Sequence, residues 1–294
     1  MILPDDVLTG VTNTLTDVLG TSLVIKDFSP VGGGCINHGG RLVTTEGDFF
    51  VKWNDATKYP GMFAAEAQGL QQLAAPGAIR IPRVISTGEH LQHQFIILEF
   101  IQSEPRSGEH WSLLGTQLAT LHRTTQPTYG LDHNNYMGSM MQVNTTHHAW
   151  IDFFIANRLE AQLKRGTDNG AIPSAIRKKF NALYNRLHNL LITEPPALVH
   201  GDLWSGNLIT DEKGNPCLID PAVYFGHREV DLAMTQLFGG FDSTFYSAYQ
   251  EAFPCEPGLQ QRLDIYNLYP LLVHVNLFGQ SYLHQVNSIL NSLL

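Results

Sequence analysis

Cysteine is scarce in this chain, whose 294 residues include only Cys35, Cys217 and Cys255. Three scattered cysteines cannot form a disulfide framework or a cysteine-rich metal cluster, and such usage favours a reducing compartment. Basic residues are also few, with 18 Lys and Arg against 27 Asp and Glu and a formal net charge of −9. Because an acidic chain opposes broad attachment to nucleic acid or anionic lipid, we expect neither as a partner.

Long apolar runs are missing as well. No run approaches the roughly 18 residues that a membrane-spanning helix needs. The amino terminus has an early Pro-Asp-Asp and lacks the basic segment of a secretory signal. We therefore expect a cytoplasmic protein without membrane attachment, and its hydrophobic fraction of 43% is that of a folded protein of one or two domains. The oligomeric state is left open.

The first hundred residues predict a β-rich lobe. A helical apolar rhythm over 3–19 ends at Gly20, a typical carboxy-terminal helix cap. Strands are predicted over 23–28, 40–44, 48–53, 84–87 and 94–99, with one helix over 63–74. A polar stretch over 102–108 then offers a hinge, which divides the chain into lobes 1–102 and 103–294.

The second lobe is predicted to be mostly helical. Helix-like spacing is found over 113–122, 149–163, 174–192, 230–237, 244–252 and 259–277. The exceptions are a strand over 197–199 and a hairpin formed by 208–209 and 217–219, while the methionine-rich segment 137–141 is predicted to be a loop. The predicted fold class is therefore α+β and bilobal, with a small β-rich amino-terminal lobe and a larger, mainly helical carboxy-terminal lobe.

The segment 200–222 has the residue types that phosphoryl transfer uses. Asp202 is followed by Asn207 and then by Asp220. A positioned carboxylate accepts the proton of an attacking hydroxyl, while an Asn and a second Asp hold the magnesium ions that bridge the phosphates of ATP. The spacing therefore predicts a phosphotransferase site.

A glycine-rich turn lies between two predicted strands of the first lobe. At Gly32, Gly33 and Gly34 the missing side chains let backbone amides approach a polyphosphate, although glycine-rich strand connections are also common. The next residue, Cys35, has two interpretations. It is either a redox switch, with an accessible thiol of lowered pKa, or a small side chain tolerated in a tight turn.

Further residues of the first lobe have the order that ATP binding requires. Lys52, in an apolar strand after the glycine-rich turn, can reach the α- and β-phosphates, and Glu66 on the following helix can hold it there. Backbone groups at Glu99, Phe100 and Ile101, which lead to the second lobe, can bind the adenine edge. ATP and Mg²⁺ are thus the expected cofactors.

Together these segments resemble the protein-kinase-like fold. The motif HGD at 200–202, in place of the HRD of protein kinases, is similar to that of the small-molecule kinases of this fold, which include aminoglycoside phosphotransferases and choline kinases. The resemblance narrows to the fructosamine kinase (ketosamine 3-kinase) family on GGGCIN, FFVKWN, GTQLATLH, WIDFFIANRLEAQL, HGDLWSGN and IDPAVYFGHREVDLAM. It extends from about residue 20 to about residue 279. It implies ATP-dependent phosphorylation of the sugar 3-hydroxyl of ketosamines, fructosamines or ribulosamines, either as small molecules or on glycated protein lysines, which is a deglycation repair.

The resemblance also implies roles for individual residues. Asp202 corresponds to the base that orients or deprotonates the sugar hydroxyl, and Asn207 and Asp220 correspond to the magnesium ligands. Lys52 and Glu66 correspond to the pair that positions the phosphates. The Phe of a protein-kinase Asp-Phe-Gly segment is replaced by proline here, so regulation by flipping of that segment is not expected.

The acceptor pocket is less well defined by the sequence. Trp204, inside the catalytic loop, can either stack on a sugar ring or pack the loop onto the helical lobe, and both interpretations stay open. Tyr224 and His227 are further candidates that one sequence cannot separate from core. His200 is expected to brace the loop through hydrogen bonds rather than to act as a base. Asp231 either accepts hydrogen bonds from the loop backbone or is a simple acid at a helix amino terminus.

Two alternatives to a ketosamine kinase follow from the same residues. A kinase of aminoglycosides or choline would share the fold, but the contexts DPAxYxG and WxDFF argue against it. A pseudokinase that only binds ATP is disfavoured because Lys52, Glu66, Asp202, Asn207 and Asp220 are all present.

Overall fold

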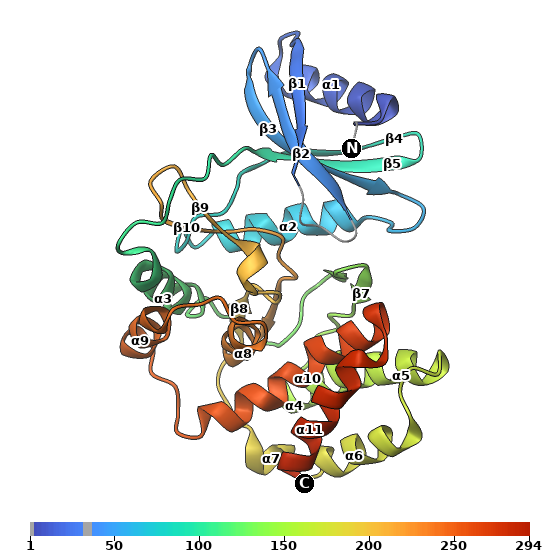
Figure 1. The fold of residues 1–294 in the computed structure, drawn as a ribbon, viewed down its shortest axis with the longest axis vertical. Helices are drawn as coiled ribbons and strands as arrows, with labels where there is room; N and C mark the ends of the chain where they lie inside the picture. The colour runs from blue at the N-terminus through green and yellow to red at the C-terminus, as the bar shows by residue number, and fades with distance from the viewer. Residues whose placement is uncertain (1–2, 32–36) are drawn as a thin grey trace.

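The computed structural model describes residues 3–31 and 37–294 and has two lobes (Figure 1). The predicted Gly32, Gly33, Gly34 and Cys35 lie outside the described residues. The first lobe is built on an antiparallel sheet of strand order β1-β2-β3-β5-β4. Its elements are α1 (Asp5–Leu19), β1 (Ile25–Pro30), β2 (His38–Thr44), β3 (Gly47–Asp55), α2 (Met62–Ala74), β4 (Val84–His90) and β5 (His93–Glu99).

Two helices cover this sheet. The apolar face of α1 places Val7, Val11 and Leu15 at a spacing of four residues, and all three are fully buried in a core with the sheet. Gly20 ends α1 in the left-handed conformation, with φ of 68°. Figure 1 shows α2 between the sheet and the second lobe, and its buried Phe63 belongs to the large core that the second lobe shares.

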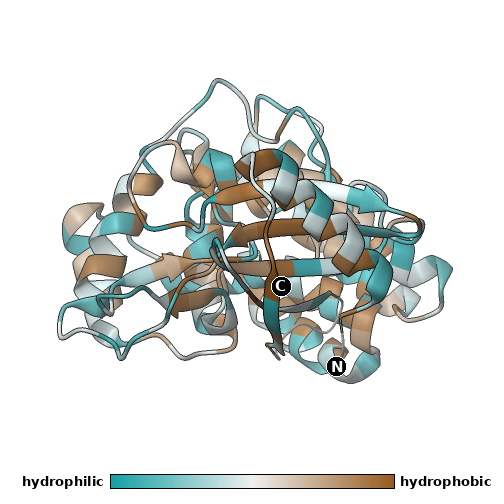
Figure 2. Ribbon diagram, turned by 90° about the horizontal axis from the view of Figure 1, so that it is seen from above, coloured by the Kyte–Doolittle hydropathy of each residue, from teal (hydrophilic) through white to brown (hydrophobic). Residues whose placement is uncertain are grey.

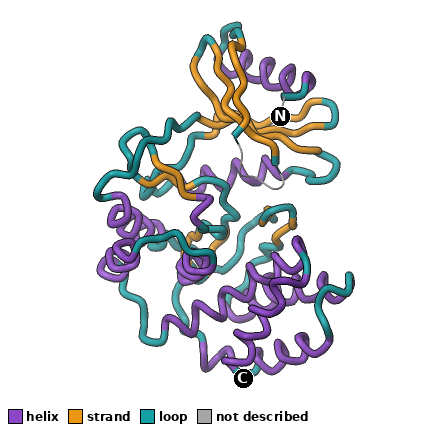
Figure 3. Tube along the Cα trace, viewed as in Figure 1, coloured by secondary structure: helices purple, strands orange, loops and turns teal. Residues whose placement is uncertain are grey.

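The second lobe is mainly helical, as the colours of Figure 3 show. Its helices are α3 (His110–Leu121), α4 (Trp150–Phe153), the π-helix η1 (Phe154–Glu160), α5 (Ala161–Asp168), α6 (Ser174–Tyr184), α7 (Leu187–Leu190), the 3₁₀ turn η2 (Ser205–Asn207), α8 (Glu229–Leu237), α9 (Ser243–Ala252), α10 (Leu259–Phe278), the 3₁₀ turn η3 (Gln280–Tyr282) and α11 (Leu283–Leu293). Among the described residues, no helix has the length and apolarity needed to cross a bilayer.

Three small antiparallel ladders complete this lobe. They pair β8 (Ala197–Val199) with β11 (Tyr224–Gly226), β9 (Leu208–Thr210) with β10 (Pro216–Leu218), and β6 (Asn135–Met137) with β7 (Met140–Gln142). The β8–β11 ladder holds both ends of the segment 200–222, which is the predicted catalytic region, and the β9–β10 hairpin lies within that segment. Apolar residues follow the strands and inner helices, while hydrophilic residues gather in peripheral loops (Figure 2).

The structure confirms the predicted bilobal α+β class and corrects several details. Segment 149–163 was predicted as one helix, but it forms α4, the π-helix and the first residues of α5. Segment 174–192 breaks into α6 and α7 near Asn185. Segment 137–141, predicted as a loop, contributes to the β6–β7 hairpin, because Tyr136 and Met141 face each other across it. Strand β11 and helix α11 were not predicted.

The polar stretch after β5 is attached to the second lobe. The amide of Glu104 donates to Asp211 O at 3.3 Å and that of Ser107 donates to Gly214 O at 3.0 Å, both in the turn of the β9–β10 hairpin. Ser103 Oγ donates to Thr210 O at 3.1 Å. The predicted boundary between 102 and 103 stays a prediction.

Candidate active site

Lys52 joins the two lobes from the middle of β3. Its ammonium donates to both carboxylate oxygens of Glu66, at 2.8 and 3.0 Å, and to Asp220 Oδ1 at 2.9 Å. The Lys52 and Glu66 side chains are 7% and 9% exposed, whereas Asp220 is 42% exposed. Burial disfavours the charge on Lys52, but the carboxylates of Asp220 and Glu66 outweigh it and raise the pKa of Lys52. A fixed cation therefore faces the loop that carries Asp220.

Asp231 on α8 fixes the start of the catalytic loop. Its carboxylate accepts the backbone amides of His200 at 2.8 Å and of Gly201 at 2.9 Å, and its Oδ2 lies 3.1 Å from Nε2 of the buried His122. His200 Nε2 donates to Ile219 O at 2.9 Å. Both His200 and Asp231 thus make the loop-supporting contacts that the sequence indicates.

Gly201 allows the catalytic loop to approach the segment 220–223, which carries the predicted metal ligand Asp220. Its φ is 81°, a region that side chains disfavour, and a Cβ at this position would lie 2.1 Å from the carbonyl oxygen of Ala222. The amide of Ala222 in turn donates to His200 O at 2.9 Å. The two backbone segments are therefore in direct contact.

Asp202 follows this contact and lies beside Asn207. Asn207 Nδ2 donates to Asp202 O at 2.9 Å, to Asp202 Oδ2 at 3.2 Å and to Asp220 O at 3.3 Å. Burial, and then the negative charge of Asp220, raise the pKa of Asp202 to about 7. A carboxyl with this pKa suits proton exchange near neutral pH.

Asn207 and Asp220 fit a magnesium site. Because the Asn207 nitrogen is occupied by backbone and carboxylate acceptors, its amide oxygen is the atom left for a cation. Asp220 has a φ of 54°, an unusual conformation for a residue with a side chain. Over residues 3–31 and 37–294, no group of three or more His, Cys, Asp or Glu is arranged to hold a metal. A carboxylate and an amide completed by phosphate oxygens and water is a ligand set that Mg²⁺ accepts.

The predicted adenine-binding residues end β5. The Glu99 carboxylate accepts Arg80 Nη2 at 2.5 Å and the Arg83 amide at 3.1 Å. The ring of Phe100 lies under the guanidinium of Arg41 at 4.7 Å, and Ile101 is buried. These side chains are therefore engaged in structural contacts, and binding of adenine by the backbone here stays a prediction.

The predicted acceptor residues differ in accessibility. Trp204 is 36% exposed, and its ring lies against Gly206 in the catalytic loop. Tyr224 is buried, with its ring 4.0 Å from the Arg158 guanidinium. His227 is fully buried and stacked on Tyr266 at a centroid distance of 5.3 Å. Because His227 offers no surface to an acceptor, we place it in the core.

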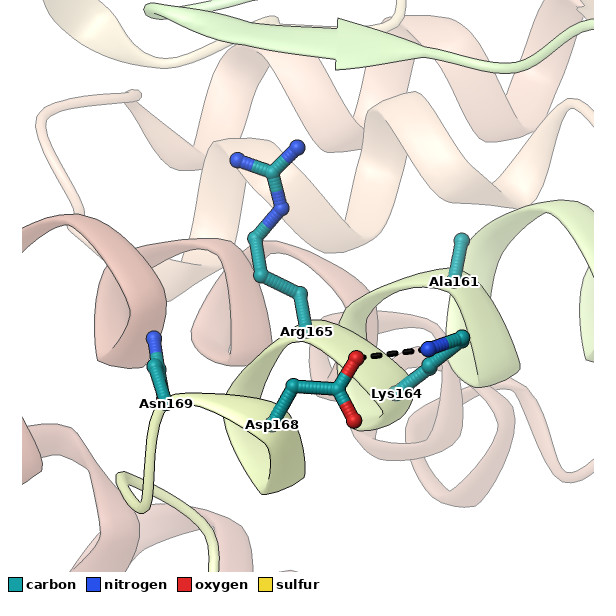
Figure 4. Close-up of a pocket in the computed structure, with 5 residues that line it drawn as sticks. All are labelled: Ala161, Lys164, Arg165, Asp168 and Asn169. Atoms are coloured by element: carbon teal, nitrogen blue, oxygen red, sulfur yellow. Dashed lines mark hydrogen bonds and ion pairs between the residues drawn. The ribbon is translucent and has the colours of Figure 1, made fainter.

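The amides of the β6–β7 hairpin were not predicted from the sequence. Asn135 and Gln142 donate to the backbone carbonyls of Val223 and Ala222, just beyond Asp220, although neither residue stands in a pattern that marks it. A separate surface hollow on α5 involves none of the site residues. It is lined by Ala161, Lys164, Arg165, Asp168 and Asn169 and contains the exposed Lys164–Asp168 ion pair (Figure 4).

The site defines a kinase of the protein-kinase-like fold. Three features support this: the bilobal fold, the contacts of Lys52 with Glu66 and Asp220, and the loop carrying Asp202 and Asn207. A fructosamine kinase family model matches residues 7–294. The chain belongs to the fructosamine kinase family, which confirms the resemblance found in its sequence.

Individual relatives agree with this assignment. The chain is 40% identical to a probable ketoamine kinase of Synechocystis over 284 residues, which is 95% of this chain and 94% of the relative. It is 39% identical to a chloroplastic protein-ribulosamine 3-kinase of Oryza sativa subsp. indica over 280 residues, covering 94% of this chain and 81% of the relative.

Solved structures show the same fold. A protein of Haemophilus somnus assigned as a fructosamine-3-kinase matches with a TM-score of 0.89 and 28% identity, over 99% of this chain and 98% of that one. An aminoglycoside phosphotransferase, 15% identical, matches with a TM-score of 0.65 over 96% of this chain and 98% of that one, which shows the fold alone. The chain is therefore an ATP-dependent kinase that acts on a sugar hydroxyl, as predicted, and the aminoglycoside and choline alternatives are not favoured.

Proposed function

We propose that this kinase transfers the terminal phosphoryl group of ATP to the sugar 3-hydroxyl of a ketosamine. The curated relatives are named for ketoamines and for protein-bound ribulosamine. The observation that carries the proposal is the assembly of Lys52, Glu66, Asp220, Asn207 and Asp202 at the junction of the lobes within a chain of this family.

In the proposed reaction Asp202 acts on the acceptor. Its carboxylate accepts a hydrogen bond from the sugar hydroxyl and takes the proton as the oxygen bonds to the terminal phosphorus, while the bond from that phosphorus to the bridging oxygen breaks and ADP leaves. Asn207 holds the Asp202 carboxylate through its 3.2 Å hydrogen bond, so the base has a defined position before the acceptor binds.

The remaining residues place the nucleotide. Lys52 supplies a fixed positive charge for the phosphates, and Glu66 keeps the ammonium in place. Asp220 and Asn207 would hold Mg²⁺, which would supply positive charge to neutralise the phosphate oxygens. Within the catalytic loop, Trp204 is the exposed ring, and we assign to it the apolar face of the sugar.

The proposed acceptors are ketosamines, either as small molecules or on glycated protein lysines. We also propose a cytoplasmic location, because the few, scattered cysteines favour a reducing compartment. The test is purified protein with Mg-ATP and a panel of fructosamines, ribulosamines, a glycated protein, aminoglycosides and choline. ADP release and product mass are measured. We expect turnover with ketosamines, and turnover of only aminoglycosides or choline would overturn the substrate assignment.

A further inference from the structure

The β6–β7 hairpin contacts the backbone immediately after Asp220. Asn135 Nδ2 donates to Val223 O at 2.7 Å, and Gln142 Nε2 donates to Ala222 O at 3.1 Å. These carbonyls lie two and three residues beyond the proposed metal ligand. The hairpin therefore holds the segment that carries this ligand through side-chain amides.

The amides of the hairpin are also bonded to one another. Asn135 Oδ1 accepts Gln142 Nε2 at 2.8 Å and Asn144 Nδ2 at 3.0 Å. The remaining oxygen of Gln142 accepts the hydroxyl of Tyr269, on α10, at 2.8 Å. All four side chains are at most 5% exposed. A buried network in which each amide has partners permits few other arrangements, so it fixes the hairpin in one position.

Arg158, on the π-helix, also donates hydrogen bonds to this network. Its Nη2 donates to Asn144 Oδ1 at 2.8 Å and its Nη1 donates to Val143 O at 2.6 Å. The guanidinium is fully buried and lies 4.0 Å from the ring centre of Tyr224. Within the described residues, its hydrogen bonds go to neutral oxygens. A π-helix is uncommon and frequently marks a functional region. Here it places the buried guanidinium of Arg158 against the residues that follow β7.

The held segment is one that needs external support. Asp220 adopts a φ of 54°, which is disfavoured for a residue with a side chain and persists only where the surroundings impose it. Ala222 is the meeting point, since its amide donates to His200 O and its carbonyl accepts Gln142. The catalytic loop and the hairpin thus fix the same residue from two sides.

We propose that Asn135 and Gln142 are positioning residues for the metal-binding loop. By holding Ala222 and Val223 they keep Asp220 in its left-handed conformation, in which its carboxylate would serve as a ligand of Mg²⁺ in the nucleotide complex. This inference rests on the proposed function for the metal role of Asp220. It adds two residues, from a different part of the chain, that act through the backbone of Ala222 and Val223.

The test compares metal binding in Gln142→Leu and in the wild-type protein. Mn²⁺ binding in the presence of ADP is followed by electron paramagnetic resonance, a measurement that needs no turnover. We expect the dissociation constant for Mn²⁺ to rise roughly 10-fold or more, as is typical when support of a metal ligand is lost. The Mg²⁺ concentration for half-maximal turnover should rise in parallel, with the KM for the ketosamine unchanged.

Asn157→Ala is the matched control. Asn157 is a buried amide of the same π-helix that donates to Thr145 O at 2.7 Å and lies outside the network. Its replacement removes one buried hydrogen bond, so it should lower the melting temperature without changing the Mn²⁺ dissociation constant. Equal weakening of Mn²⁺ binding in both variants, or wild-type binding in Gln142→Leu, would overturn the inference.

A second variant tests the same inference in case Gln142→Leu does not fold. Asn135→Ala removes the donor to Val223 O without introducing a charge. It should weaken Mn²⁺ binding in the same direction, and unchanged binding would contradict the positioning role. If the wild-type protein binds Mn²⁺ with ADP but phosphorylates no ketosamine, the substrate assignment fails while the positioning role is still decided by these variants.

Discussion

The ammonium of Lys52 lies 2.9 Å from the carboxylate of Asp220 and so connects a strand of the small lobe to a loop of the large lobe. The same ammonium is held by Glu66 from α2. The three charges belong to three different segments, yet two of them are almost completely buried. Their proximity means that the order of the small lobe and the geometry of the loop that carries Asp220 depend on one another.

Removal of the Lys52 charge should damage both stability and ATP binding. Lys52→Met leaves Glu66 buried without its partner, which should reduce the free energy of unfolding by about 3 kcal/mol or more. The double variant Lys52→Met/Glu66→Leu should recover most of this stability while staying inactive, because the charge for the phosphates is still missing. Urea unfolding and calorimetric titration of ATP measure the two effects. An active double variant would contradict the role of Lys52.

Replacement of the proposed base should separate chemistry from binding. Asp202→Asn keeps the size of the side chain and should lower kcat by roughly 10²- to 10⁴-fold, with ATP affinity nearly unchanged. Asp132→Asn is the control, since the Asp132 side chain is 88% exposed and lies outside the site. Steady-state kinetics and ATP titration decide the outcome. Retention of full kcat in Asp202→Asn would remove this residue from the proposed mechanism.

Two glycines in the left-handed conformation should respond differently to alanine. Gly201→Ala adds a Cβ 2.1 Å from Ala222 O, whereas Gly20→Ala places one in open space. Gly20→Ala should therefore cost about 1–2 kcal/mol of stability and leave activity intact. Gly201→Ala should cost about 3 kcal/mol or more and abolish turnover, because the catalytic loop must move away from the metal-binding segment. Equal destabilisation of both, measured by urea unfolding, would show that the loops tolerate separation.

The buried His227 should make stability depend on pH. Burial lowers the pKa of His227 to about 4, against the opposing effect of Glu194. The unfolded chain binds a proton near pH 6.5 whereas the folded chain does not, so stability is complete above this pH and falls as the pH decreases toward 4. Between pH 7 and pH 5 this histidine should account for a loss of about 2 kcal/mol.

Urea unfolding at both pH values checks this dependence. His227→Gln should reduce the difference between pH 7 and pH 5. An unchanged pH dependence in His227→Gln would show that other buried groups, among them His200, dominate acid destabilisation.

The sequence predicted the elements that depend on neighbouring residues. The spacing from Asp202 to Asp220 lies within one hairpin region, and the order of Lys52 and Glu66 follows a strand and the next helix. Because these signals are local, they could be interpreted without knowledge of the packing.

What escaped prediction depends on distant partners. Strand β11 is three residues long and exists because it pairs with β8, which precedes it by more than twenty positions. The π-helix has the apolar rhythm of an ordinary helix, so its wider turns leave no mark on the sequence. Gln142 becomes important only through Ala222, some eighty residues away. The burial of His227 likewise follows from its tertiary neighbours.

The attachment of residues 103–107 to the β9–β10 turn limits how the lobes can move. A polar stretch with the composition of a flexible joint is instead tied to the turn by the amides of Glu104 and Ser107. The same hairpin is bonded to the small lobe as well, since the amide of Leu218 in β10 donates to Arg80 O at 3.0 Å. We therefore expect movement between the lobes to involve the β9–β10 hairpin and not the polar stretch alone.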